Sequence, residues 1–232
     1  MNIAQRPVAA ALSLRKPAYF FAVGALAVGM AFPAGNARAE SNFITATGTA
    51  SAKLNFSIVI PKFLFLQVGT GTPFANNTAV DTIVFDMTSA ISSIGNGTAQ
   101  AATSGGDVSP GVVTARVVGN GFTAATNLSA TTLGAMSNGT QTISWSEISV
   151  ATPAALTGVT PAPTATLQHP GTLTNPFSDT GSTTVSLTPV SGVINQGAKW
   201  TFSYKNTNVP AAGTYGSTVA NKGQVTYAIA LP

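Results

Sequence analysis

A regular alternation of apolar and polar positions runs from Ile44 to Ile60. One parity carries aliphatic residues, phenylalanine, alanine and glycine, whereas the other carries threonine, serine, lysine and asparagine, with Val59 as its one apolar member. A period of two predicts an extended strand with one buried face, because successive side chains leave a pleated backbone on opposite sides. At roughly 3.3 Å per residue the stretch would span more than about 50 Å, whereas typical strands span about 17–20 Å. We therefore expect the chain to bend inside it, or its two halves to belong to different sheets.

Short apolar packets separated by turn signals continue the strand pattern along the chain. Glycine-containing turn sequences recur at Asn96-Gly97, Gly105-Gly106-Asp107, Asn120-Gly121 and Asn138-Gly139. Asn-Gly favours the positive φ angles that tight hairpins need. The strand candidates around these turns are residues 62–68, 81–87, 111–118, 141–150, 183–187, 200–204 and 225–231. The pattern predicts an all-β sandwich or barrel with little helix.

Proline interrupts this pattern repeatedly between Ala151 and Phe177. Because proline has no N–H to give to a strand ladder, the stretch predicts a loop or a sheet-edge excursion. The flanking halves are similar in composition, and no convincing internal repeat separates them. We expect one domain with a Pro-rich loop at about residues 151–177, the alternative being a linker between two domains.

The beginning of the chain has the features of a secretory signal peptide. Basic residues precede an apolar run from about Ala18 to Phe32, which is followed by the small-residue sequence Ala37-Arg38-Ala39. The run is shorter than the roughly 20 residues that a membrane span needs. We expect cleavage that removes residues 1–39 and leaves a mature chain beginning at Glu40, the alternative being an uncleaved anchor.

Removing the signal peptide changes the charge of the chain. The whole sequence has ten Lys and Arg against six Asp and Glu, but four of the basic residues precede Glu40. Six basic and six acidic residues remain, so the mature net charge is zero. No cluster of Lys and Arg is left to bind nucleic acid or an anionic membrane. A neutral chain with few charges and no cysteine lacks self-repulsion and disulfides, which suits a protein that associates with copies of itself.

The sequence offers little for catalysis or cofactor binding. His169 is the only histidine and has no recognisable nucleophile context, so we expect an ordinary loop histidine and no catalytic site. One histidine without cysteine excludes His/Cys metal sites, and we expect neither metal nor cofactor. Trp145, Trp200, Tyr204 and Tyr215 could line a glycan-binding face by stacking. Core packing is the favoured role of the two tryptophans, because each shares its parity with aliphatic residues.

The two ends of the mature chain resemble a known family. Residues 46–56 and 58–61 are similar to the N-terminal extension and first strand of fimbrial subunits assembled by the chaperone–usher route. Residues 210–215 and 223–229 are similar to the closing A-G-x-Y turn and terminal alternating strand of those subunits. The chain departs from the family in a middle region longer than that of a minimal pilin, and it lacks cysteine, as the capsule-like fibre subunits do.

The resemblance implies an incomplete immunoglobulin-like antiparallel β-sandwich that lacks its last strand. A periplasmic chaperone fills the gap until the N-terminal extension of the next subunit replaces it. The expected partners are therefore further copies of this chain, a chaperone and an outer-membrane usher, and the expected location is a fimbria at the cell surface. The implied donor positions are Ile44, Ala46, Gly48, Ala50 and Ala52. The residues implied to edge the acceptor groove are Tyr227, Ile229 and Leu231.

With this resemblance the opening alternation can be divided. Residues 54–60 carry large side chains and are expected to form a strand that supports the core of their own domain, residues 54–232. Within the extension of residues 40–53, Ile44 to Ala52 carries small apolar residues, which at roughly 25 cal/mol per Å² bury too little area to hold an isolated edge strand. We expect them to be a donor strand for a preformed groove, with the junction near Lys53.

Two functions from different classes follow. The first is a non-enzymatic structural subunit of a bacterial fimbria or pilus-like fibre, which polymerises by donor-strand exchange and serves adhesion or biofilm formation. The alternative is a secreted, self-contained β-sandwich that binds a host or matrix glycan as a monomer. The sequence leaves open whether the donor segment acts on a neighbour or folds back on its own domain.

Overall fold

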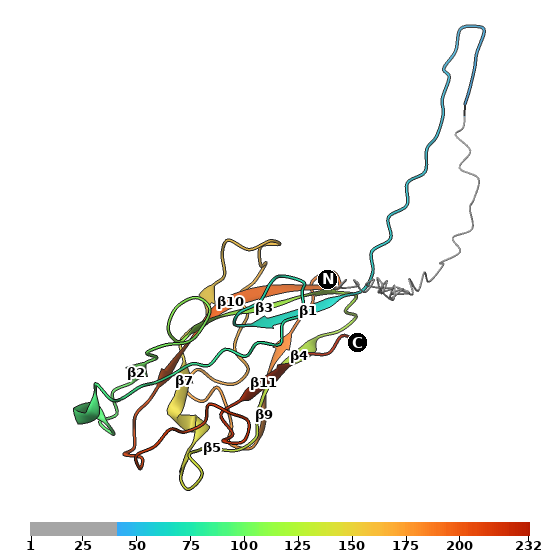
Figure 1. Cartoon of the computed structure of the whole chain (residues 1–232). Helices are drawn as coiled ribbons and strands as arrows, with labels where there is room; N and C mark the ends of the chain where they lie inside the picture. The colour runs from blue at the N-terminus through green and yellow to red at the C-terminus, as the bar shows by residue number, and fades with distance from the viewer. Residues whose placement is uncertain (1–40) are drawn as a thin grey trace, which may run out of the picture. The chain divides into compact units, whose positions relative to one another are not determined.

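The computed structural model describes residues 41–232, so the predicted signal peptide at residues 1–39 lies outside the described part. The chain divides into two units, the first ending at Ile58 and the second comprising Val59–Pro232. Strands and irregular loops build the second unit, with two short 3₁₀ turns, η1 (Ile91–Ser93) and η2 (Trp145–Glu147), and no α-helix in the described residues (Figure 1). Within residues 41–232 there is no helix capable of spanning a bilayer.

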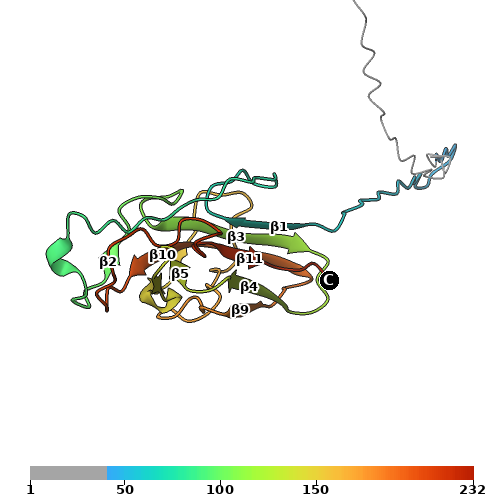
Figure 2. The ribbon, with the colours of Figure 1, turned by 60° about the horizontal axis from the view of Figure 1, so that its bottom comes forward.

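Two antiparallel sheets and a small hairpin make up the second unit. The strands are β1 (Leu64–Val68), β2 (Gln100–Ala101), β3 (Val112–Asn120), β4 (Thr126–Thr132), β5 (Met136–Ser137), β6 (Thr142–Ile143), β7 (Ile148–Val150), β8 (Ala154–Ala155), β9 (Gly181–Leu187), β10 (Val193–Tyr204) and β11 (Val225–Ala228). The larger sheet has the order β1-β3-β10-β2, with β7 and β8 also paired to β10. The smaller sheet has the order β11-β4-β9, and β5 pairs with β6. This all-β, antiparallel architecture is consistent with a β-sandwich (Figure 2).

The hydrophobic core draws on alternate positions of strands from both sheets. Because alternate side chains of a strand face one side, each sheet contributes one face to the core. The residues that β3, β4 and β10 contribute to the hydrophobic core are Val113, Ala115, Val117, Leu128, Ala130, Ile194, Ala198, Trp200, Phe202 and Tyr204. The predicted core packing of the two tryptophans is confirmed, since Trp145 is 6% and Trp200 is 0% exposed.

The strand predicted for residues 141–150 is divided in the structure. β6 and β7 occupy parts of it, and the turn η2 separates them. The Ser144 hydroxyl accepts a hydrogen bond from the Ser146 N–H at 3.0 Å, which caps the turn. A local hydrogen bond between a serine side chain and the backbone therefore takes the place of strand pairing at Ser144–Ser146. The strand predicted for residues 81–87 is wrong, because only Val84 forms an isolated bridge there.

Residues 151–177 form a loop apart from the two-residue strand β8, which pairs with β10. Part of this loop is buried, because Leu167 is 0% and His169 is 3% exposed. The Trp200 indole N–H donates to the Leu167 carbonyl at 3.0 Å, and the rings of His169 and Trp200 have centroids 4.6 Å apart. His169 therefore lies in a loop, as predicted, but its environment is not that of an ordinary loop histidine, because its side chain packs in the core.

Candidate assembly site

The N-terminal segment, residues 41–60, forms no strand and exposes its apolar side chains. Its large side chains are exposed as follows: Phe43 86%, Leu54 70%, Phe56 86%, Ile58 86% and Ile60 73%. The last four lie at alternate positions and form one apolar stripe of a strand-like repeat. Fully burying one such side chain is worth roughly 1.5–3 kcal/mol. A contiguous exposed apolar stripe of this kind is a candidate interaction site.

The prediction that residues 54–60 form a strand in the core of their own domain is wrong. None of these residues is buried, and none pairs with a strand of the described chain. The exposed stripe therefore continues to Ile60 and does not end near Lys53.

The end of β3 explains why residues 54–60, which precede β1, do not pair with it. The pairing of β1 with β3 begins at Leu64, and β3 ends at Asn120. The Asn120 side chain holds the chain just before β1: its Oδ1 accepts from the Phe63 N–H at 2.9 Å, and its Nδ2 donates to the Pro61 carbonyl at 3.0 Å. Gly121 then turns the chain with a φ of 78°, a conformation that glycine adopts without strain. No length of β3 remains for residues 54–60 to pair with.

The five predicted donor positions lie in the exposed N-terminal segment. All of them are exposed: Ile44, Ala46, Gly48, Ala50 and Ala52. Their exposure leaves both their side chains and their backbone accessible to a partner. Their role as donor positions stays a prediction.

The predicted acceptor edge lies on β11 and the residues that follow it. Tyr227, Ile229 and Leu231 are half-buried and, together with Val225, pack against the core. The positions between them are exposed, so the alternation continues to Leu231 although β11 ends at Ala228. β11 pairs with β4, and no second strand within residues 41–232 pairs with it. Its outer edge therefore offers backbone N–H and C=O groups to an added strand.

The larger sheet also ends in a strand with one partner. β1 pairs only with β3 within residues 41–232, and its Leu64, Leu66 and Val68 are half-buried against the core. The Lys62 Nζ donates to the Pro232 carbonyl oxygen at 3.1 Å, which brings the start of β1 beside the end of the chain. Lys62, two residues before β1, and Pro232, after β11, thus meet at one end of the second unit.

Tyr227 is fixed to the core through His169. Because a carbonyl only accepts hydrogen bonds, the His169 Nδ1, 2.5 Å from the Pro170 carbonyl oxygen, carries the proton and Nε2 accepts from the Tyr227 hydroxyl at 2.9 Å. Burial lowers the pKa of His169 to about 4, although the bond to Pro170 acts in the opposite direction. Burial also raises the pKa of the Tyr227 phenol. Both groups are therefore neutral at neutral pH.

The sequence pattern located the alternation of the terminal strand but did not indicate this histidine contact. His169 lies in a proline-rich stretch without strand periodicity, and no local signal gives its burial. Comparisons with protein-family models, curated proteins and solved structures found no match. The candidate assembly site therefore rests on the exposed N-terminal segment and on the open edges of β1 and β11.

Proposed function

We propose that this protein is a structural subunit of a bacterial surface fimbria that polymerises by donor-strand exchange. The observation that carries the proposal is the exposed, alternating apolar pattern of the N-terminal segment. The second unit of the same chain has a complementary feature, the half-buried strand β11, whose outer edge has no partner strand within residues 41–232. In β-strand addition, backbone bonds supply affinity and alternate side chains fill pockets. Two copies of the chain offer these complementary features to each other.

The fold that this function needs is an immunoglobulin-like sandwich with one strand missing. The strand order supports this fold, because β1 and β11 each have one partner strand within the described residues. The hydrogen bond from Lys62 to Pro232 links the segment before β1 to the segment after β11. A donor strand on the outer edge of β11 would extend the smaller sheet. It would also cover apolar side chains of β1 and β11 that are now half-buried.

The donor in this proposal extends to Ile60. Leu54, Phe56, Ile58 and Ile60 supply most of its apolar area, and at roughly 1.5–3 kcal/mol each they contribute at most about 6–12 kcal/mol before ordering costs. The predicted donor positions in Ile44–Ala52 have small side chains, which allow close approach to a partner backbone but bury little area. The two halves therefore differ in what they contribute, although they share one parity.

A periplasmic chaperone and an outer-membrane usher complete the proposal. An open apolar strand edge is an aggregation hazard for an exported chain. A chaperone that covers the β11 edge removes this hazard until the next copy arrives at the usher. The assembled fibre serves adhesion or biofilm formation at the cell surface.

Gel migration of cell-surface extracts tests this function. Donor-strand polymers resist SDS without heating, so unboiled extract should give a ladder of bands that collapses to one band on boiling. A single band in both lanes would reject polymerisation and support the monomeric alternative.

A pair of adjacent substitutions tests the donor strand itself. Ile58→Asp places a charge on the apolar stripe, whereas Ser57→Asp places the same charge on the opposite parity. We expect the first change to abolish the ladder and the second to retain it. If both variants polymerise equally, residues 54–60 are not the inserted part of the donor.

A further inference from the structure

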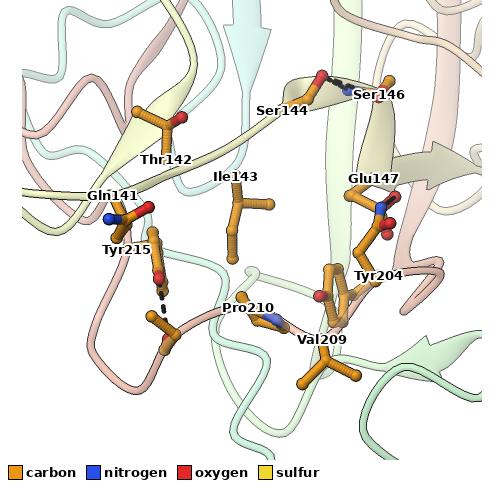
Figure 3. A pocket seen from close by; sticks show the side chains of 12 residues that line it. Gln141, Thr142, Ile143, Ser144, Ser146, Glu147, Tyr204, Val209, Pro210 and Tyr215 are labelled. Carbon is orange, nitrogen blue, oxygen red and sulfur yellow. Dashed lines mark hydrogen bonds between the residues drawn. The ribbon is translucent and has the colours of Figure 1, made fainter.

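A pocket with a volume of about 300 Å³ lies between the segments of residues 141–147 and 208–215. Tyr204, the last residue of β10, also lines it. Figure 3 shows Ile143, Pro210 and the two tyrosines, Tyr204 and Tyr215, around this space. The volume is at the lower end of the roughly 300–1,000 Å³ of small-molecule sites, so it suits a small ligand.

The polar groups of this pocket are incompletely used by the protein. Tyr204 is only 8% exposed, yet its hydroxyl has no hydrogen-bond partner within residues 41–232. The side-chain amide of Gln141 and the Oδ1 of Asn208 also have no partner among the described residues. Gln141 and Asn208 are exposed, and the Tyr204 hydroxyl is not among the fully buried atoms without a partner, so a ligand can reach all three. These groups therefore offer donors and acceptors to a ligand.

The walls of the pocket are fixed before any ligand arrives. The Glu147 carboxylate accepts hydrogen bonds from the Thr207 N–H at 2.9 Å, from the Thr207 hydroxyl and from the Asn208 Nδ2 at 3.0 Å. The Tyr215 hydroxyl donates to the Ala211 carbonyl at 2.8 Å (Figure 3). A preformed wall lowers the ordering cost of binding. The same bonds leave the Tyr215 ring as an apolar surface.

The lining disfavours an anionic ligand and favours a neutral one with many hydroxyls. No Lys or Arg within residues 41–232 lines the pocket, and its carboxylate already accepts three hydrogen bonds from the protein. Tyrosine rings, a proline and an isoleucine supply apolar surface, whereas the phenol and the amides supply hydrogen bonds. A pyranose ring presents the same combination, with C–H groups on its faces and hydroxyls at its rim. We propose that this pocket binds one neutral hexopyranose residue of a glycan.

A second hollow gives this site room for a longer chain. It has a volume of about 460 Å³ and shares Ser144 and Ser146 with the first. Ser178, Thr183 and Asn175 give it further hydroxyl and amide groups. Its carboxylate, on Asp179, accepts the Trp145 N–H at 2.6 Å. A glycan bound in the first pocket can therefore continue across the Ser144–Ser146 turn.

Saturation-transfer NMR on the full-length exported protein tests the proposal. The probes are the methyl glycosides of glucose, galactose, mannose and N-acetylglucosamine, with N-acetylneuraminic acid as the anionic comparator. We expect saturable binding of at least one neutral glycoside and none of the anionic sugar. Absence of saturable binding for all neutral probes, or preference for the anion, would overturn the proposal.

Two conservative variants assign the binding to the pocket. Tyr204→Phe removes a hydroxyl without a protein partner, so we expect the fold to persist and the affinity to fall by several-fold to about ten-fold. Thr78→Val removes an exposed hydroxyl outside the pocket, which also has no partner within residues 41–232, and should retain the affinity. Gln141→Ala, at an exposed position, should also weaken binding. Unchanged affinity in folded Tyr204→Phe and Gln141→Ala proteins would overturn the proposal. If these proteins still form the SDS-resistant ladder, the failure concerns the pocket and not polymerisation.

Discussion

Acidification should loosen the core at the point where His169 meets Tyr227. The His169 ring is 3% exposed and is surrounded by the rings of Phe177, Trp200, Phe202 and Tyr227, with centroids 4.6–5.7 Å away. Among residues 41–232, Tyr227 is the titratable side chain that contacts the ring. Protonation would place a charge in this apolar surrounding. It would also add a proton to Nε2, which now accepts the hydrogen bond from Tyr227.

The pKa of His169 sets the direction and size of the effect. In the unfolded chain histidine titrates near its usual value of about 6.5, whereas in the folded protein burial lowers the pKa of His169 to about 4. Between these values the unfolded state binds more protons, so the free energy of unfolding falls as the pH falls. One proton gives a slope of about 1.4 kcal/mol per pH unit, and the window of about 2.5 units gives a loss of about 3 kcal/mol. Above about pH 6.5 the contribution is complete and constant.

Urea unfolding followed by tryptophan fluorescence measures this loss between about pH 8 and about pH 4. The matched control is the double variant His169→Phe/Tyr227→Phe, which removes the titrating group and both hydrogen-bonding partners. Replacing both partners by apolar groups of similar shape costs little, whereas removing one leaves the other buried and unpaired. The difference between the two pH profiles isolates His169 from the carboxylates, which titrate in both proteins.

Two results would refute this reasoning. If the free energy of unfolding of the wild-type protein stays level from pH 6.5 to about pH 4, the histidine is not buried and neutral as the structure has it. If the double variant loses stability with the same slope, other groups cause the acid sensitivity. A single His169→Phe variant should lie below the double variant in stability by about 1–3 kcal/mol, because it leaves the Tyr227 hydroxyl unpaired.

Two further predictions concern buried polar side chains. Arg116 is 0% exposed, and its Nε and Nη1 have no hydrogen-bond partner within residues 41–232. Arg116→Met should therefore leave the urea midpoint unchanged or raise it. A fall of more than about 1 kcal/mol in the free energy of unfolding would contradict this. Asn206 is 0% exposed with a φ of 59°, and it accepts from the Gly95 N–H at 2.8 Å and donates to the Ser93 carbonyl at 2.7 Å. Thermal unfolding should show a loss of about 2 kcal/mol or more for Asn206→Gly and about 1 kcal/mol beyond that for Asn206→Ala. Of the two replacements, only glycine adopts this φ without strain, so equal losses would contradict the backbone argument.

Strand parity could be predicted from the sequence because it is a local property. Trp200, Phe202 and Tyr204 share one parity, and all three are buried on β10. The same reasoning fails for residues 54–60, because an alternation has the same form whether its apolar face meets its own domain or another molecule. Only the end of β3 at Asn120 decides that this stretch stays unpaired in the single chain.

The missed features depend on tertiary contacts or on local side-chain bonds that compete with a ladder. Ser144 breaks the strand predicted for residues 141–150 through one hydrogen bond to the backbone, which periodicity does not record. His169 lies in a stretch whose prolines exclude a regular repeat, so no parity could assign it to the core. Free polar groups such as the Tyr204 hydroxyl emerge only when two distant segments are brought together.

The contact between His169 and Tyr227 bears directly on how a strand can be added at the edge of β11. An edge strand with one partner is expected to fray, because half of its backbone groups face solvent. Here the Tyr227 side chain is hydrogen-bonded to His169, and the centroid of its ring lies 5.5 Å from that of Trp200. Through His169, the loop of residues 151–177 therefore restrains β11 from the core side. A fixed edge lowers the ordering cost of strand addition. It follows that His169→Ala should weaken assembly even where Ile44–Ile60 is unchanged, since the acceptor loses its rigidity while the donor keeps every side chain.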